Sequence, residues 1–234
     1  VTELQKPQPQ QKVKMKKREF AVIGLGRFGQ TVALTLERKG HYVLGIDENK
    51  DSVQAVASEL SQAIIADSTN EEALKALDIP SFETVVVAIG SKFEANIMTT
   101  VSLKEMGVKQ VICKALTARQ EQILLRVGAD QVVRPERDSG FRLAESLISP
   151  TMIDKFSLGE DTDYSIVEYS VPSVLCNQSL AQNDLRGRFN LNVLLIKRGA
   201  EVIVNPPPDA ILYTSDVIVI LGHEADLQAF SELG

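Results

Sequence analysis

The chain has 234 residues, of which 44% are hydrophobic and 24% are charged, and its formal net charge is −6. This composition is ordinary for a globular protein. No apolar run approaches the roughly 20 residues that span a bilayer, and the polar start VTELQKPQPQQ gives no expectation of secretion. Cys113 and Cys176 have no paired spacing, so we expect reduced thiols and a cytoplasmic protein.

Charge is distributed unevenly along the chain. Residues 1–18 carry six basic residues and one acidic residue, a net charge of +5, which leaves −11 for the remainder. A body this acidic argues against a broad nucleic-acid surface, so we expect no nucleic-acid partner. We interpret the basic tail as a solvated, disordered leader; contact with anionic lipid or with a partner is the alternative.

Short β-branched runs alternate with amphipathic stretches from Glu19 onwards. The expected strands are 20–23, 42–46, 63–66, 84–89, 110–113 and 131–133, and the expected helices are 27–39, 50–59, 70–77, 92–106, 117–126 and 137–149. Apolar strands separated by helices imply a parallel sheet covered on both faces. We therefore predict an α/β fold with a Rossmann-like, doubly wound domain over residues 19–154.

The alternation stops near Pro150, and a polar segment follows. The expected strands beyond it are 164–171, 192–197, 201–204 and 217–221, with a hairpin turn at 197–200 and short helices near 179–185 and 224–233. Residues 155–234 are therefore expected to form a small α+β domain. Its core would be modest, so packing against a second copy is plausible.

The strongest chemical signal is the loop GLGRFG, which runs from Gly24 to Gly29. It follows an apolar strand and precedes a helix. In this context Gly24 permits a tight turn, Gly26 lets a phosphate approach the backbone, and Gly29 lets helix and strand pack closely. The helix amides and dipole then face an anion. The alternative is that these glycines serve an ordinary strand-to-helix turn.

Acidic residues follow the second and third strands. Asp47 ends the second strand, where its carboxylate can accept hydrogen bonds from both ribose hydroxyls and would repel a 2′-phosphate. A simple turn aspartate is the alternative. Asp67, Ser68 and Thr69 close the third strand at the same edge of the sheet, where they would lie along the adenine or cap the next helix.

Arg27 separates two nucleotide classes. Pyrophosphate already uses the backbone donors of such a loop, so an added arginine suits terminal phosphates and favours ATP or ADP over a dinucleotide.

Few residues suit catalysis. His41 begins the second strand, and His223 is expected to begin the last helix. There is no lysine of the phosphate-loop type after the glycines, so we expect binding without turnover. The alternatives are an NAD/NADH sensor and, with less support, a short NAD-dependent oxidoreductase.

Motifs along most of the chain resemble one family. The segments FAVIGLGRFGQTVA, GHYVLGIDEN, AIIADSTNEEAL, VVVAIGSKFEANIMTT, VICKAL and GADQVVRPERDSG are similar to those of the RCK (KTN) regulatory subunits of Ktr/Trk bacterial potassium uptake systems. The match runs from about Phe20 to the C-terminus. The Arg-Phe pair in the glycine loop and the PERD segment point to the Ktr branch.

The resemblance implies an assembly and a switch. It implies a homo-octameric ring, a tetramer of dimers, that docks at the inner face of the cell membrane beneath a potassium channel subunit. It also implies that neighbouring subunits exchange a crossover helix, which matches residues 138–149. Exchange of ATP and ADP would change the shape of the ring and gate the channel.

The resemblance also implies site residues. The nucleotide contacts it assigns are Gly24, Leu25, Gly26, Arg27, Phe28, Gly29, Asp47, Glu48, Asn49, Asp67, Ser68, Thr69, Ala88, Ile89, Gly90 and Lys114. Glu136 matches a glutamate associated with Mg²⁺ or Ca²⁺ at the dimer interface; without the resemblance it is a helix N-terminal acid. For cyclic di-AMP in the C-terminal domain, the matching residues are Arg186, Gly187, Arg188, Phe189 and Pro206, and plain dimerisation is the alternative.

Overall fold

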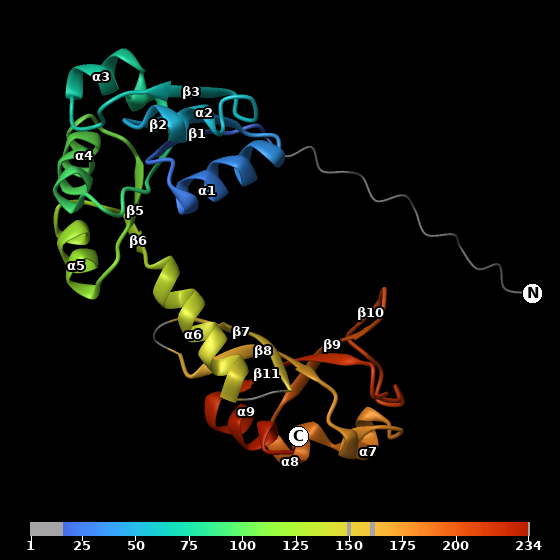
Figure 1. The fold of residues 1–234 in the computed structure, drawn as a ribbon. Coiled ribbons are helices and arrows are strands. Elements are labelled where there is room, and N and C mark those ends of the chain that lie inside the picture. The colour runs from blue at the N-terminus through green and yellow to red at the C-terminus, as the bar shows by residue number, and fades with distance from the viewer. Residues whose placement is uncertain (1–15, 149–150, 160–161, 234) are drawn as a thin grey trace, which may run out of the picture. The chain divides into compact units, whose positions relative to one another are not determined.

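The computed structural model describes residues 16–148, 151–159 and 162–233 (Figure 1), so most of the predicted leader lies outside it. The contacts divide the chain into two compact units, Val1–Glu136 and Arg137–Gly234. The sequence interpretation drew this division at residue 154. Residues 137–154 belong instead to the second unit. Within it, β7 (Met152–Ser157) pairs with β8 (Tyr164–Ser170). Of the helices in the described ranges, none is both long and apolar enough to cross a membrane.

The first unit is a parallel sheet with the strand order β3-β2-β1-β4-β5-β6. Its strands are β1 (Glu19–Ile23), β2 (Tyr42–Asp47), β3 (Gln62–Ile65), β4 (Thr84–Val87), β5 (Gln110–Lys114) and β6 (Gln131–Val133). Its helical elements are α1 (Arg27–Arg38), α2 (Lys50–Gln54), α3 (Glu71–Ala76), η1 (Ile79–Ser81), α4 (Phe93–Glu105) and α5 (Ala118–Arg126), and α6 (Pro135–Ile148) crosses the division. This is the doubly wound Rossmann order, in which the direction of strand addition reverses beside β1. The predicted fold class is confirmed.

Helices cover both faces of this sheet because its strands are apolar on both sides. Val22 of β1 packs in a core with Ala33 of α1, whereas its neighbour Ile23 packs in another core with Leu103 of α4 and Leu124 of α5. All five side chains are at most 1% exposed. Figure 1 shows α1 on one side of the sheet and α4 and α5 on the other. The two cores fix the carboxyl ends of the strands, where a ligand would bind.

The second unit is an antiparallel sheet with the order β10-β9-β11-β8-β7. Besides β7 and β8 it contains β9 (Asn192–Arg198), β10 (Glu201–Val204), β11 (Val217–His223), η2 (Ser173–Leu175), α7 (Leu180–Asn183), α8 (Leu185–Phe189) and α9 (Glu224–Ser231). The predicted hairpin is confirmed, since Arg198 pairs with Glu201 around Gly199, whose φ is +60°. Three elements were missed: β7, η2, and α8, which Asp184 separates from α7 by its left-handed φ of 43°.

Two local predictions concern helix starts. Capping of α3 by residues 67–69 was one of two interpretations of that segment, and it was wrong: the side chain of Asn70 accepts hydrogen bonds from the amides of Glu72 and Ala73. The prediction for His223 is confirmed, because it precedes α9 and its Nδ1 accepts from the Ala225 amide at 3.3 Å.

Candidate functional site

The glycine loop connects β1 to α1, and its three glycines have different physical reasons. Gly24 has a φ of +94°, in the left-handed region, and its amide donates to the Ile46 carbonyl at 2.8 Å. A Cβ on Gly29 would lie 1.8 Å from the carbonyl oxygen of Gly24, so no side chain fits there. A Cβ on Gly26 would meet nothing within 4 Å. The outer glycines thus build the turn, and Gly26 leaves its backbone open to a ligand.

The start of α1 is open to an anion. Gly26 is its N-cap and supplies no side-chain bond, and no acidic residue lies in the first turn. The amides of that turn therefore keep hydrogen-bonding capacity and carry the positive end of the helix dipole. Arg27 adds an exposed guanidinium, for which the described part of the chain supplies no ion-pair partner.

A cavity of about 290 Å³ opens beside this loop. It lies at the carboxyl ends of β1, β2 and β4, where the strand order reverses and where ligands bind in folds of this kind. Ten of the predicted nucleotide residues line it: Gly24, Gly26, Asp47, Glu48, Asn49, Asp67, Ser68, Ala88, Ile89 and Gly90. Six others do not line it: Leu25, Arg27, Phe28, Gly29, Thr69 and Lys114. Leu25 is fully buried.

Asp47 joins the glycine loop to the second strand. Its Oδ2 accepts a hydrogen bond from the Leu25 amide at 2.6 Å, and its Oδ1 accepts from the Asn49 amide at 2.8 Å. Each carboxylate oxygen has a second acceptor position. Asp47 can therefore hold the loop in shape and still accept from two ribose hydroxyls.

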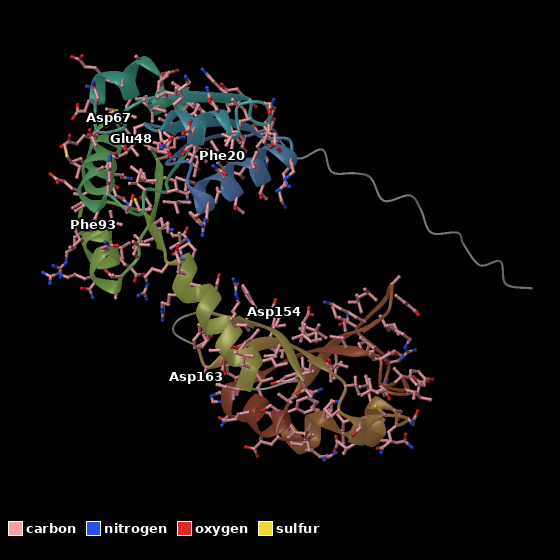
Figure 2. The ribbon with its side chains drawn as sticks, in the orientation of Figure 1. Phe20, Glu48, Asp67, Phe93, Asp154 and Asp163 are labelled. Atoms are coloured by element: carbon pink, nitrogen blue, oxygen red, sulfur yellow. The ribbon has the colours of Figure 1, made fainter. Side chains whose placement is uncertain are left out.

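The crevice carries three carboxylates and one ammonium among its described lining residues. Asp67 accepts from the amide and the hydroxyl of Thr69 at 2.9 and 2.7 Å, and these bonds lower the pKa of its carboxyl. Glu48 pairs with Lys92 of the β4–α4 loop. This pair raises the pKa of Lys92, and Asp67 and Asp47 add to the effect. Figure 2 labels Glu48 and Asp67 at the same region of the first unit, and both line the cavity.

A buried amide in α4 supports the segment after β4, which lines the crevice. Asn96 of α4 is 1% exposed, and its Nδ2 donates to the carbonyls of Ile89 at 2.7 Å and Lys114 at 3.0 Å. Ser68 is held in a similar way, since its hydroxyl hydrogen-bonds the Thr99 hydroxyl at 2.9 Å. These bonds fix the loops that carry Ile89 and Ser68 against α4.

Lys114 and Glu136 form a separate charged pair. The Lys114 ammonium, on a side chain only 11% exposed, lies 2.6 Å from the Glu136 carboxylate and 5.7 Å from the centre of the Phe28 ring. Its hydrogen bond lowers the pKa of Glu136. Within the described ranges, no three histidine, cysteine or acidic side chains are grouped to hold a metal ion. A single carboxylate already paired with an ammonium does not provide the several oxygens that Mg²⁺ or Ca²⁺ requires.

The residues assigned to cyclic di-AMP separate into two groups. Arg186 and Pro206 line one cavity of about 290 Å³. Gly187 does not line it; it lies in α8, where a Cβ would lie 2.2 Å from Oδ2 of the N-cap residue Asp184, so this glycine makes room for the cap. Phe189 packs edge-on against the core residue Phe230, and Arg188 stacks on Phe189. Arg186 and Pro206 are therefore the two that face a ligand-sized space.

The comparisons with known proteins cover most of the chain. Residues 20–135 match the TrkA-N domain, and residues 166–233 match the TrkA-C domain. Ktr system potassium uptake protein C of Bacillus subtilis (strain 168) is 39% identical over 216 residues, which cover 92% of this chain and 97% of that protein. The chain belongs to the Ktr potassium uptake protein family. Ktr system potassium uptake protein A of Vibrio alginolyticus is 37% identical over 210 residues, covering 90% of this Ktr chain and 94% of its own length.

Solved structures of low identity share the fold of this Ktr protein. The GsuK channel has a TM-score of 0.69 at 16% identity over 94% of this chain and 40% of its own. A GsuK channel bound to NAD has a TM-score of 0.65 at 14% identity, with the same coverage. The RCK domain of GsuK has a TM-score of 0.66 at 15% identity over 94% of this chain and 48% of its own. The chain thus has the RCK fold.

Six residues that line the crevice were missed by sequence reasoning: Ile23, Ser52, Ala66, Ser91, Lys92 and Ala95. One signal was available. In a parallel sheet the segments that follow adjacent strands meet at one edge, so the residues after β4 should have been extended from Gly90 to Lys92. No charge or glycine pattern marks Ser52 or Ala95.

Proposed function

We propose that this Ktr protein is a nucleotide-binding regulatory subunit of a potassium uptake system and that ATP and ADP switch it. Relatives at 37–39% identity are named for potassium uptake and not for catalysis. A regulator needs a binding site that recognises a nucleotide without transforming it. The crevice beside Gly26 fits that requirement.

The separation of charge across the crevice carries the proposal. At one end, the uncapped start of α1 and the exposed Arg27 present donors and positive charge. After β2 and β3, Asp47 and Asp67 present acceptors, and both line the cavity. A nucleotide has the matching polarity, because its phosphates are anionic and its ribose hydroxyls donate hydrogen bonds.

Arg27 favours ATP or ADP over NAD. A dinucleotide pyrophosphate is satisfied by loop amides, whereas terminal phosphates carry more charge, which a guanidinium can bind in a bidentate manner. An NAD/NADH sensor is the second candidate. Asp47 suits the ribose of either ligand, and a GsuK channel of the same fold has been solved bound to NAD.

The switch follows from a change in phosphate charge. Loss of the terminal phosphate would remove the anionic partner that we propose for Arg27, whether that phosphate is held by the same subunit or by a neighbouring copy. Such a change biases two conformations only if the ligands have different affinities for them. A coupling free energy of about 1–3 kcal/mol per site is typical, and repeated sites in a ring add to it.

The proposed assembly is a homo-octameric ring in the cytoplasm, docked on a membrane potassium transporter subunit. The crossover helix α6 supports it, since Phe141, Leu147 and Ile148 are 57%, 74% and 80% exposed. Large apolar side chains at this exposure indicate a surface that another chain covers.

A divalent cation at Glu136 would take its remaining oxygens from a nucleotide and a second copy. Cyclic di-AMP is proposed for the cavity lined by Arg186 and Pro206.

Calorimetric titration with ATP, ADP, NAD and NADH, together with mass measurement of the assembly, tests the proposal. We expect Arg27→Ala to weaken ATP binding by about tenfold or more, which is the loss for a charge-assisted hydrogen bond, and to spare NADH. Arg38→Ala is the matched control, because Arg38 is an exposed arginine in the last turn of the same helix. Equal losses for ATP and NADH would contradict the preference, and a monomer that binds only NADH would overturn the proposal.

A further inference from the structure

Glu48 and Lys92 meet across the mouth of the crevice. Glu48 belongs to the segment after β2, and Lys92 belongs to the segment after β4. These strands flank β1 in the sheet, so the ion pair spans the end of β1 from which the glycine loop departs. Both side chains line the cavity, and both are more than half exposed, at 54% and 61%. They therefore lie at its rim and not at its floor.

The position of Lys92 is unfavourable for the helix it precedes. Lys92 is the N-cap residue of α4 and makes no side-chain cap bond. Serine, threonine, aspartate and asparagine are the residues that stabilise this position. A cation there also adds to the positive end of the helix dipole. Local preferences of this kind are violated mainly at functional sites, where another interaction compensates.

The other carboxylates of the crevice already have partners on their own segments or on the glycine loop. Asp47 accepts from two backbone amides, and Asp67 accepts from Thr69 twice. Glu48 is different, because its charged partner comes from the opposite segment. Among the described residues that line the cavity, this pair is the one side-chain bond that joins the segment after β2 to the segment after β4.

We propose that Lys92 is a positioning residue of the nucleotide crevice, whose ion pair with Glu48 closes the mouth over the bound nucleotide and slows its release. The inference rests on the proposed function, because it requires a nucleotide inside. The pair must open for exchange and re-form afterwards. Lys92 also reduces the repulsion that the three carboxylates exert on phosphates entering past them.

An exposed pair of this kind has a limited and salt-sensitive effect. The free energy of such an exposed pair is small, so its loss should change the rate of nucleotide release by about 1.5-fold to fivefold. At about 1 M salt the Debye length falls to about 3 Å, so the contribution should disappear. The expected signature is therefore a release rate that depends on salt in the wild type and much less in variants without the pair.

Stopped-flow release of the fluorescent analogue 1,N6-etheno-ADP, which leaves both ribose hydroxyls free, into excess ADP measures this rate. We expect Glu48→Gln and Lys92→Gln each to release the probe about 1.5 to five times faster at low salt. The double variant should be no faster than either single variant, because both remove one interaction. Lys92→Arg and the exchange of both charges, Glu48→Lys with Lys92→Glu, should restore slow release.

Glu71 and Lys75 of α3 provide the matched control, since they form an exposed lysine–glutamate pair at 49% and 59% exposure outside the cavity lining. Glutamine at both positions should leave release unchanged. Release at the wild-type rate from both single variants, or rates that multiply in the double variant, would overturn the role of the pair. If the wild type binds neither this probe nor NADH, the proposed function fails as well.

Discussion

Gly26 and Gly29 belong to one loop but should respond in opposite ways to the same substitution. An alanine at position 29 would place its Cβ 1.8 Å from the Gly24 carbonyl oxygen and 3.1 Å from the Ala88 Cβ. The first contact is with backbone, so no side-chain rotation can relieve it. Overpacking of a tight site typically costs about 1–3 kcal/mol, and we expect Gly29→Ala to reach or exceed the upper value.

Alanine at position 26 meets nothing within 4 Å, and the backbone there, at φ −71° and ψ −175°, suits any residue. The loss of a glycine cap costs a few tenths of a kcal/mol. The smaller entropy of the unfolded chain offsets it by about 0.4–1 kcal/mol. We therefore expect Gly26→Ala to change the free energy of unfolding by less than about 1 kcal/mol. Its methyl group would occupy the space by which a phosphate approaches, so ADP affinity should fall by at least about tenfold.

Urea unfolding gives the free energy of unfolding of each variant; it is followed by circular dichroism because the chain has no tryptophan. Calorimetry with ADP gives the ADP affinity. The result that refutes the reasoning is a Gly29→Ala protein as stable as the wild type, or a Gly26→Ala protein that binds ADP with undiminished affinity. In the first case Gly29 of α1 would not lie as close to the Gly24 carbonyl as the structure shows. In the second case the phosphates would lie away from Gly26.

Two further predictions concern buried groups. The Arg198 guanidinium donates to the buried carboxyl of Asp216 and lowers its pKa in the folded protein. The stabilisation that this ion pair gives the folded protein is fully present above the pKa of an aspartate in the unfolded chain, about 3.9. It is lost as the pH falls through the lower pKa of Asp216 in the folded protein. The loss in free energy of unfolding that Asp216→Asn causes, measured in urea, should therefore be large at pH 7 and smaller near pH 3. An equal loss at both pH values would contradict this. Burial raises the pKa of the Cys113 thiol to about 11, so iodoacetamide at pH 8 should modify it only in urea, as measured by mass spectrometry. Modification of the native protein would show that the strand opens.

The first unit was predictable because its determinants are local. The apolar strands, the glycine spacing and Asp47 at a strand end are all properties of short segments, and the sheet order follows from general rules for such folds. The position of Lys92 after β4 could have placed it at the crevice, but its pairing with Glu48 could not be predicted locally. Its role in the crevice depends on Glu48, a residue 44 positions away, which only the assembled sheet brings near.

The second unit was predicted less completely. β7 was missed because Met152 is buried whereas Ile153 and Phe156 are 49% and 67% exposed, so the strand lacks the usual alternation. The helix expected near 179–185 corresponds to α7, and α8 was missed; the left-handed conformation of Asp184 that separates the two helices is not marked by a glycine. The assignment of site residues to a particular nucleotide stays a prediction, which the titrations above would decide.

The amide of Asn96 has a mechanical consequence for any signal that starts in the crevice. Its two donated bonds fasten the ends of β4 and β5 to the same helix, and its own backbone amide donates to the Lys92 carbonyl at 3.1 Å. Breaking a side-chain bond would leave a buried donor unsatisfied, at a cost of about 1–3 kcal/mol. We therefore expect the two strand ends and the N-terminal part of α4 to move together when either loop is displaced.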